Sequence, residues 1–295
     1  MDDIKKIKDL VKKVLGSDCE IIKIERIGGL SNRNYYTKTS KGDYSIRLAG
    51  YGTSKITNRK DEKISTLLAN ETGIDAELIY FDEINGDKIS KFINNGITMS
   101  PSSLKEVSNI IHITKIYKKL HNCKKNTGII FNIENITSNY ENIINNSDVD
   151  YFDDFFEVKK FVKPFIFNQV NSKNKVPCHN DPVCENWILE KTKELEKMYL
   201  IDWEYGAMNN PIWDLALVSC EAGFGEKEDN ILLKNYYNDF DIENIKELFE
   251  YKIVIDYYLS LWAKTRIPYD NQIMIDYSCE HYKRMKKNIE IYLKI

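Results

Sequence analysis

The first part of the chain changes from a helical to an extended pattern of apolar residues. Residues 2–15 carry isoleucine, leucine and valine three and four positions apart, and Gly16 ends the pattern. Such spacing collects the apolar side chains on one face and predicts an amphipathic helix. Strand-like alternation, with turn residues between the runs, follows at 21–27, 34–39 and 43–49. These runs predict an antiparallel meander.

A second helix and a hairpin complete this part of the chain. Residues 58–70 return to helical spacing, and two further strand-like runs, 78–82 and 87–93, flank an Asn-Gly-Asp turn. A turn of this composition between apolar runs favours a β-hairpin. After the opening helix, the predicted order of elements is therefore β-β-β-α-β-β by residue 93.

Beyond residues 94–96 the apolar spacing is mainly helical. The clearest helical pattern runs from 103 to 121, and the stretch 176–205 departs from it with a loop and two short strand-like runs. We therefore expect an α+β protein with two lobes. The small β-rich N-terminal lobe comprises residues 1–93, and the larger, mainly helical C-terminal lobe comprises residues 94–295.

Composition and charge restrict the classes of partner. The 295 residues are 42% hydrophobic and 29% charged, and 42 basic and 45 acidic residues give a net charge of -3. Without a basic excess, nucleic acid is not expected as a partner. We find no apolar leader and no uncharged apolar run of membrane-spanning length, so we expect a cytoplasmic protein that does not bind membranes. The oligomeric state stays unknown.

Cysteine usage fits the same interpretation. The six cysteines are scattered, form no Cys-x-x-Cys pair and have no histidines clustered near them. Structural zinc sites usually contain Cys-x-x-Cys pairs or clustered histidines, and disulfide frameworks contain regularly spaced cysteines. Neither pattern is present here. The cysteines are therefore predicted to be reduced and mostly buried.

Two motifs in the C-terminal half supply groups that phosphoryl transfer requires, namely a carboxylate that orients the attacking hydroxyl and ligands for Mg²⁺. Residues 179–186 repeat the His-x-Asp-x₄-Asn spacing of a kinase catalytic loop, so Asp181 is the candidate base and Asn186 a candidate metal ligand. An apolar strand then ends in Asp202, where kinases carry a second metal ligand. Alone, each residue fits an Asx-turn or a surface carboxylate. His179 is expected to organise the loop by hydrogen bonds.

The N-terminal half contains candidate nucleotide contacts. Glycines between two predicted strands would let backbone N–H groups approach phosphates, and this segment consists of Gly28, Gly29, Leu30, Ser31 and Asn32. A hairpin turn without a ligand explains the same residues. Arg47 stands where kinases carry the phosphate-binding Lys, and Glu62 is its expected partner; alone, Arg47 would be a strand-edge charge. Lys91, Phe92 and Ile93, at the connection to the second lobe, are expected to contact adenine.

The sequence resembles the choline/ethanolamine kinases, and most closely the LicA-type choline kinases of bacteria. The resemblance spans nearly the whole chain and is most specific in the segments 28–35, 45–50, 178–189 and 200–224. It implies a two-lobed protein-kinase-like fold, ATP and Mg²⁺ as cofactors, and transfer of the γ-phosphoryl group to choline to give phosphocholine and ADP. Pro182 and Cys184 depart from the commoner residues of the catalytic loop, and we expect only local packing changes there.

The same resemblance implies roles for individual residues. Asp181, Asn186 and Asp202 take the catalytic and metal-binding roles, and Glu204 is a further metal ligand or substrate contact. Choline has a permanent charge and no N–H donor, so aromatic faces and a carboxylate would bind it. The resemblance points to four residues for this purpose: Glu221, Tyr258, Trp262 and Tyr277.

Simpler interpretations exist for several of these residues. Taken alone, Trp262 would be a core residue and Glu221 an ordinary helix-surface residue, and Leu259 stands where the family has an aromatic side chain. Asp214 is expected to fix the catalytic loop by hydrogen bonds. The basic residues of the last helix are predicted to form a solvated face; these are Lys283, Arg284, Lys286 and Lys287.

The fold class does not choose the substrate. An ethanolamine kinase is the first alternative, and an aminoglycoside phosphotransferase, with several carboxylates for a polycationic sugar, is the second. A catalytically silent nucleotide-binding scaffold is the alternative from another class. Retention of Asp181, Asn186 and Asp202 argues against the silent scaffold, because loss of any one would suffice to abolish activity.

Overall fold

The structure is a computed structural model that describes residues 3–28, 32–50 and 58–295. Its internal contacts divide the chain into two compact units, one of residues 1–99 and 185–207 and one of residues 100–184 and 208–295. The division of function after residue 93 remains a prediction. Within the described ranges, no helix is both long and apolar enough to cross a bilayer.

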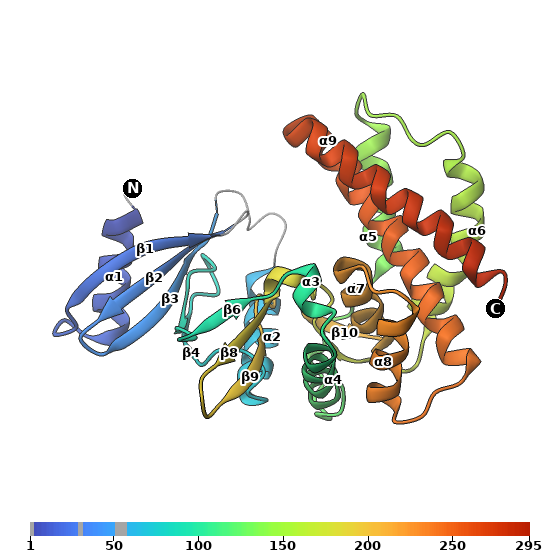
Figure 1. Ribbon diagram of the computed structural model, residues 1–295. Helices are drawn as coiled ribbons and strands as arrows, with labels where there is room; N and C mark the ends of the chain where they lie inside the picture. The colour runs from blue at the N-terminus through green and yellow to red at the C-terminus, as the bar shows by residue number, and fades with distance from the viewer. Residues whose placement is uncertain (1–2, 29–31, 51–57) are drawn as a thin grey trace. The chain divides into compact units, whose positions relative to one another are not determined.

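The first unit is built on a five-stranded antiparallel sheet in the order β1-β2-β3-β5-β4 (Figure 1). Helix α1 (Asp3–Leu15) packs its apolar face on this sheet. The predicted meander and hairpin are confirmed, because period-two alternation places Tyr35, Ile46 and Ile89 on the face that α1 covers. The strands are β1 (Ile21–Gly28), β2 (Arg33–Thr39), β3 (Gly42–Leu48), β4 (Leu78–Phe81) and β5 (Lys88–Lys91).

Helix α2 (Arg59–Glu71) follows β3, as the spacing predicts. It begins at Asn58, whose side chain accepts hydrogen bonds from two backbone N–H groups of the first turn. A small antiparallel sheet, β6-β8-β9, completes the unit; its strands are β6 (Gly96–Thr98), β8 (Trp187–Lys191) and β9 (Glu196–Leu200). The Leu200 N–H donates to the Ile74 carbonyl at 3.1 Å, which fixes the end of β9 beside the α2–β4 connection.

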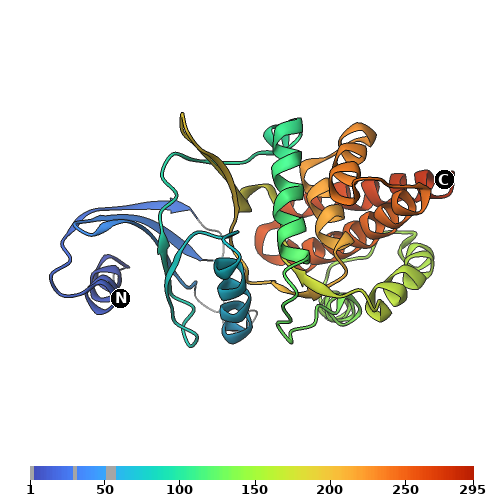
Figure 2. The ribbon, with the colours of Figure 1, turned by 90° about the horizontal axis from the view of Figure 1, so that it is seen from below.

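The second unit is mainly helical, as Figures 1 and 2 show. Every residue of α7 except Glu221 is buried, as expected for a helix with apolar residues on all sides. Strands β7 (Val176–Cys178) and β10 (Ala207–Asn209) pair with each other. The helices are α3 (Pro101–Leu104), α4 (Val107–His121), α5 (Ile133–Asn145), α6 (Phe155–Asn171), α7 (Ile212–Ala222), α8 (Glu226–Tyr237) and α9 (Ile242–Tyr292).

The single helix expected over 103–121 is instead two helices, α3 and α4. Glu106 has an extended backbone, with φ −63° and ψ 133°, and forms the N-cap of α4. The side-chain amide of Asn109 donates to the Ser103 carbonyl at 2.8 Å and satisfies one backbone group at the end of α3. The apolar spacing continues across the break, which is why the sequence pattern did not reveal it.

Helix α9 folds back on itself. The Tyr292 hydroxyl donates to the Glu250 carboxylate at 2.9 Å, although a straight helix would separate these residues by about 60 Å at its usual rise. Nearer the reversal, the Ser278 hydroxyl donates to the Ser260 carbonyl at 2.9 Å. Pro268 lies between the two serines and removes a helical hydrogen-bond donor there. The two arms of α9 therefore run side by side.

The basic residues of the second arm do not form a uniformly solvated face. Lys283, Lys286 and Lys287 are exposed, as expected. Arg284 is different, because its guanidinium turns inward to the fully buried carboxylate of Asp256 in the first arm. The prediction was wrong for Arg284, since helical spacing alone did not show that a buried acid lies opposite.

All six cysteines belong to the described residues, and none forms a disulfide. Cys178, Cys184 and Cys220 are buried, whereas Cys279 is exposed. The prediction of burial holds for these three, while Cys19 and Cys123 are half-buried, and the reduced state stays a prediction.

Candidate active site

Two arginines and three carboxylates gather in the first unit, and we call them the arginine–carboxylate cluster. Arg47 forms an ion pair with Glu62, as predicted, and its Nη1 lies 3.5 Å from Asp202 Oδ1. Arg59 Nη1 lies 2.5 Å from Glu62 Oε2 and 3.8 Å from Glu204 Oε2. Asp202 is the most accessible member, with 38% of its side chain exposed. Two buried guanidinium groups are thus paired with carboxylates that face them from α2 and from the end of β9.

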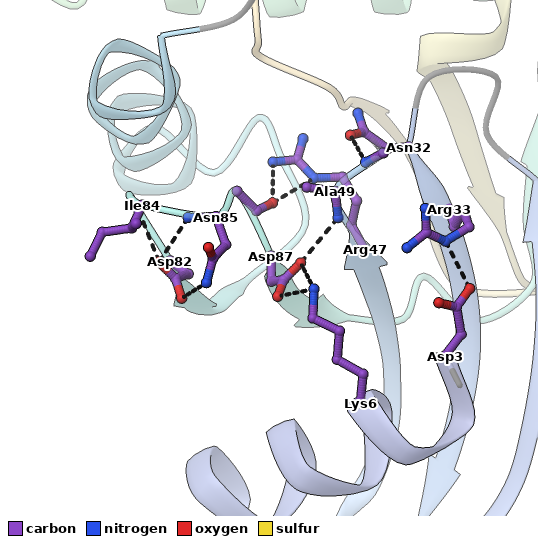
Figure 3. Close-up of polar contacts among 12 residues, drawn as sticks. Asp3, Lys6, Asn32, Arg33, Arg47, Ala49, Asp82, Ile84, Asn85 and Asp87 are labelled. Atoms are coloured by element: carbon purple, nitrogen blue, oxygen red, sulfur yellow. Dashed lines mark hydrogen bonds and ion pairs between the residues drawn. The ribbon is translucent and has the colours of Figure 1, made fainter. Parts of the chain in front are cut away.

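The turn between β4 and β5 binds Arg47, which Figure 3 shows beside it, and lies close to Arg59. The Gly86 carbonyl accepts hydrogen bonds from Arg47 Nε at 3.2 Å and Nη2 at 2.9 Å. The next residue, Asp87, accepts from the Ala49 N–H at 3.0 Å and so fixes the end of β3. Gly86 has φ +81°, and a β-carbon there would lie 2.4 Å from Arg59 Nε. Glycine is therefore required at this position for both backbone conformation and space.

The acidic groups of the cluster outnumber the basic ones by one. Burial, followed by the charges of Asp202 and Glu62, raises the pKa of Glu204 to about 7. Nearby, burial raises the pKa of Asp75 to about 6. An excess of crowded carboxylates favours binding of a hard divalent cation, and oxygen ligands of this kind suit Mg²⁺. The residues thus fit the metal that the family resemblance implies.

The chain brings Asn186 and Asp202 into neighbouring segments. The Ile201 N–H donates to the Asn186 carbonyl at 2.9 Å, so the residue before Asp202 is fixed beside Asn186. Asp202 itself has φ +68°, a left-handed conformation that is uncommon for residues other than glycine. Such a strained backbone is found most often at functional positions, where surrounding contacts maintain it.

In the second unit, Asp214 fixes the backbone of the catalytic loop. Its two carboxylate oxygens accept from the N–H groups of His179 and Asn180, each at 2.8 Å. Trp213 Nε1 donates to the Asn180 carbonyl at 3.2 Å, and Asn180 has φ +66°. His179 Nδ1 accepts from the Asp181 N–H at 3.2 Å. The loop-fixing interactions expected of Asp214 and His179 are present, and they determine the backbone position of Asp181.

His121 contacts Asp214, the residue that fixes the loop. The sequence analysis did not predict a role for His121. Its Nε2 lies 3.2 Å from Asp214 Oδ2, and its Nδ1 lies 2.8 Å from the Tyr236 hydroxyl. Tyr117, one turn earlier in α4, donates to the Asp214 carbonyl at 3.1 Å. The ligand atoms of His121, Asp214 and Cys178 lie within 4.8 Å of one another, but hydrogen bonds already engage both Asp214 oxygens. We therefore interpret the group as an anchor for the loop and not as a metal site.

The proposed substrate residues Glu221, Trp262 and Tyr277 lie together in the same unit. The rings of Trp262 and Tyr277 are 5.7 Å apart and nearly perpendicular, and Trp262 is half-buried. Burial raises the pKa of Tyr277, and the charges of Glu221 and Asp181 raise it further. The Tyr277 ring lies 4.2 Å from the His281 ring, and His281 Nε2 lies 3.8 Å from Glu221 Oε1, so Tyr277 and Glu221 share a neighbour.

Tyr258 adds a second aromatic group. Its ring stacks on Tyr140 at 5.8 Å and lies 6.0 Å from Trp213. Burial raises the pKa of Tyr140, and the Asp181 charge adds to this effect. Sequence reasoning missed Tyr140, because it considered aromatic residues of the last helices only. Leu259, the departure from the family pattern, is buried and belongs to the core.

The predicted phosphate-binding segment is described only at its ends, since residues 29–31, which are Gly29, Leu30 and Ser31, lie outside the described ranges. Gly28 ends β1 with φ +141°. Asn32 is buried, and its Oδ1 accepts from the Gly50 N–H at 3.3 Å and from Arg59 Nη2 at 3.5 Å. Asn32 therefore joins the arginine–carboxylate cluster, while the phosphate contact of the segment stays a prediction.

The predicted adenine segment makes contacts within the first unit. The Phe92 N–H donates to the Asp43 carbonyl at 3.0 Å, and Lys91 Nζ lies 4.6 Å from the centre of the Tyr44 ring. The Ile93 carbonyl accepts from the N–H three residues later at 3.2 Å. The backbone groups just named are thus already engaged, and adenine binding at Lys91, Phe92 and Ile93 stays a prediction.

Comparisons with protein-family models, curated proteins and solved structures all indicate the same family. A family model described as choline/ethanolamine kinase matches residues 24–292. Protein LicA of Haemophilus influenzae is 27% identical over 218 residues; the aligned part covers 74% of this chain and spans 63% of that relative's length. The crystal structure of choline kinase LicA from Streptococcus pneumoniae is 29% identical and superposes with a TM-score of 0.82, covering 99% of this chain and 100% of that chain. A crystal structure of LicA in complex with AMP is 28% identical, with a TM-score of 0.77 and 98% of each chain covered.

Proposed function

Because the chain belongs to the choline/ethanolamine kinase family, we propose that it is a choline kinase that transfers the γ-phosphoryl group of ATP to the choline hydroxyl. The products are phosphocholine and ADP. The observation that supports the choice of substrate is the aromatic pair of Trp262 and Tyr277, whose Tyr277 ring lies 4.2 Å from the His281 ring, while His281 Nε2 lies 3.8 Å from Glu221 Oε1. A carboxylate beside aromatic faces is the chemistry that recognises a quaternary ammonium.

Asp181 is the residue that orients the choline hydroxyl and accepts its proton. Its loop is rigid because Asp214 binds two consecutive backbone N–H groups, and a carboxylate held in one place lowers the entropic cost of reaching a reactive geometry. Asn186, Asp202 and Glu204 are the residues that would hold Mg²⁺. When bound, this ion neutralises charge on the phosphates.

Two features favour choline over the alternative substrates. Ethanolamine carries three N–H donors that need acceptors, whereas the rings of Trp262 and Tyr277 offer faces to a methylated ammonium. An aminoglycoside would need several carboxylates around its amines, but the groups nearest to Glu221 include His281 Nε2 at 3.8 Å and Arg284 Nη2 at 3.9 Å. Repulsion from Arg284 grows with the charge of the ligand, so it opposes a polycationic sugar more strongly than the single charge of choline. Ethanolamine remains the second candidate within the family.

The remaining assignments complete the proposal. Residues 1–93 bind the nucleotide, through Arg47, the segment 28–32 and the segment 91–93, while residues 94–295 carry catalysis and substrate recognition. The intact arginine–carboxylate cluster and the anchored catalytic loop both speak against a silent scaffold. The protein works in the cytoplasm on a small molecule and needs neither nucleic acid nor a membrane.

A substrate panel tests the proposal. Coupled ADP-release assays with choline, ethanolamine, thiamine, methylthioribose and kanamycin should give the highest kcat/KM for choline. The matched control is Asp181→Asn, which reports any contaminating ATPase because it lacks the base. Turnover restricted to kanamycin would overturn the choline assignment.

A further inference from the structure

A buried hydrogen bond ties helix α2 to the segment that carries Asp202 and Glu204. The Ser65 hydroxyl donates to the Gly206 carbonyl at 2.7 Å, and we call this contact the serine tether. Ser65 is 2% exposed. Because a hydrogen bond is stronger in such a dry environment than in water, the contact can restrain the backbone that it binds. The serine tether therefore fixes the chain just after Glu204.

A second hydrogen bond attaches the same segment on its other side. The Leu200 N–H donates to the Ile74 carbonyl at 3.1 Å, shortly before Asp202. Ile74 belongs to the connection that follows α2. Asp202 and Glu204 thus lie between two attachments, one to α2 and one to the chain at its end.

The segment between these attachments is a tight turn that needs outside support. The Gly206 N–H donates to the Trp203 carbonyl at 3.0 Å, and Trp203 Nε1 donates to the Leu200 carbonyl at 3.0 Å. Within the turn, Asp202 has the left-handed φ of +68°. Such a conformation persists only where surrounding contacts maintain it. Loss of the serine tether should therefore let the backbone of Asp202 relax.

The close approach of α2 to this turn depends on glycine. A β-carbon on Gly206 would lie 2.5 Å from Ser65 Cβ and 2.9 Å from Ser65 Oγ. Carbon atoms do not pack at these distances, so a side chain at this position would push the turn away from the helix. The contact between Ser65 and Gly206 thus has a steric as well as a polar requirement, and each can be changed separately.

Helix α2 also holds the arginines of the arginine–carboxylate cluster. Glu62 precedes Ser65 by three residues, so the two side chains lie on the same face of the helix. Glu62 pairs with Arg47 and with Arg59. One helix therefore contacts the arginines through Glu62 and the turn with the acidic residues through Ser65.

We propose that Ser65 is a positioning residue for metal binding, whose hydroxyl fixes the turn of Asp202 and Glu204 to α2. The tether keeps these carboxylates beside Arg47, whose Nη1 lies 3.5 Å from Asp202 Oδ1, in the arrangement that binds Mg²⁺ with the nucleotide. This inference rests on the proposed kinase function, and it adds a neutral hydroxyl to the groups on which that function depends.

The central experiment measures Mg²⁺ affinity without turnover. Mg²⁺ is titrated by calorimetry into protein held in excess over the non-hydrolysable analogue β,γ-imido-ATP. Ser65→Ala should raise the Kd for Mg²⁺ by roughly 3- to 10-fold, the scale of one hydrogen bond, and leave the Kd for the metal-free nucleotide unchanged. Alanine is a strong helix former, so α2 should keep its own stability. An unchanged Mg²⁺ affinity would overturn the inference.

The matched control is Thr66→Val in the same turn of α2. Thr66 is fully buried, and its Oγ1 has no hydrogen-bond partner among the described residues. This substitution also removes a buried hydroxyl, but it leaves the serine tether intact, so the Mg²⁺ affinity should stay at the wild-type value. Equal losses of Mg²⁺ affinity in both variants would show a general effect of disturbing α2 and would overturn the inference.

Turnover gives a second readout. In Ser65→Ala, the Mg²⁺ concentration for half-maximal activity should rise by the same factor as the Kd, while the choline KM at saturating Mg²⁺ stays unchanged. A purely structural role would instead lower the melting temperature and leave the Mg²⁺ requirement as it is.

The steric requirement is tested from the other partner. Gly206→Ala should also raise the Kd for Mg²⁺, because the added carbon collides with Ser65. In the double variant Ser65→Gly/Gly206→Ala the colliding atoms are gone, so its Kd should match that of Ser65→Gly alone. Additive losses would mean that the two residues do not act through one contact. If Gly206→Ala does not fold, Ser65→Ala decides alone.

Failure of this inference and failure of the proposed function can be told apart, because the Mg²⁺ titration contains no choline. Absence of choline turnover by the wild-type protein would refute the proposed substrate, and the titration would still test the serine tether. Normal choline turnover by the wild-type protein, with wild-type Mg²⁺ affinity in Ser65→Ala, would refute the serine tether alone.

Discussion

Asp181 occupies a loop whose shape depends on its neighbours, so its own contribution can be isolated. Asp181→Asn keeps the size and polarity of the side chain but cannot accept the hydroxyl proton. Because Asp214 binds the loop through backbone N–H groups, the loop should keep its conformation. We expect kcat to fall by about 10²-fold or more, the usual scale for a general base, while ATP binding is retained. Full turnover in this variant would place the base elsewhere.

Substitutions of Trp262 distinguish whether this side chain contacts the substrate or only fills the core. A quaternary ammonium over an indole face gains about 0.5–2 kcal/mol, so Trp262→Ala and Trp262→Leu should each raise the choline KM by roughly 2- to 30-fold without changing the ATP KM. Leu restores apolar area but not the electrostatics of the ring. If Trp262 is only core, the Leu variant will bind choline normally, and the Ala variant will mainly lose stability, by about 3–5 kcal/mol. KM values and melting temperatures of both variants distinguish these outcomes.

Glu204 should make the stability of the metal-free protein depend on pH. Its pKa in the folded state is raised from 4.5 to about 7 by burial and by Asp202 and Glu62. Between these two values the folded state binds more protons than the unfolded state, so stability falls as pH rises through this window. The melting temperature in EDTA should therefore decrease from pH 5 to pH 7, and less steeply in Glu204→Gln. Identical slopes for both proteins would exclude Glu204 as the titrating group.

Candidate site residues that belong to a sequence motif could be predicted, whereas those outside any motif could not. Asp181, Asn186 and Asp202 stand in motifs with diagnostic spacing, and the partnership of Arg47 with Glu62 followed from the kinase pattern. Arg59 and His121 had no such signal, because a basic residue at a helix start and a histidine at a helix end are ordinary in sequence. Only the folded chain brings Arg59 to Glu204, and His121 to Asp214.

At the scale of elements, the β4–β5 turn supports the arginine–carboxylate cluster. Alanine substitutions at two glycines, one inside this turn and one outside it, test that support. Gly86 and Gly128 both have positive φ, +81° and +73°. A β-carbon at Gly86 would collide with Arg59, whereas at Gly128 no atom of the described residues would lie within 4 Å of it. Both alanine variants should lose about 1 kcal/mol or more from backbone strain. Gly86→Ala should lose more, and it alone should raise the ATP KM. Equal melting temperatures and equal ATP KM values would show that the turn does not position the arginines.

Elements were predicted well where their pattern is local. Alternation gave the strands of the first sheet, and helical spacing gave α1, α2 and the mainly helical character of the second unit. The reversal of α9 and the break between α3 and α4 could not be read in this way, because apolar spacing reports which face is buried and not where the axis bends. The reversal brings the proposed substrate residues together, since it sets Tyr277 beside Trp262.

At the scale of the whole molecule, the sequence determines the fold and the family through motifs along nearly its whole length. It determines the substrate through only a few side chains. Motif order along nearly the whole sequence identifies the kinase family, and the match over residues 24–292 agrees with it. In the proposed function, the choice among small alcohols depends on a few side chains that helices far apart in sequence bring together. Tyr140 on α5, Glu221 on α7 and the arms of α9 are examples. For this reason the substrate is the claim that most needs direct measurement.

That measurement is the detection of the product itself. Purified protein with ATP, choline and Mg²⁺ is followed by phosphorus NMR, with Asp181→Asn and an EDTA-treated sample as controls. We expect a phosphomonoester resonance that coincides with authentic phosphocholine, grows in step with ADP, and is lost in both controls. ADP accumulating with inorganic phosphate and without phosphocholine would contradict this expectation.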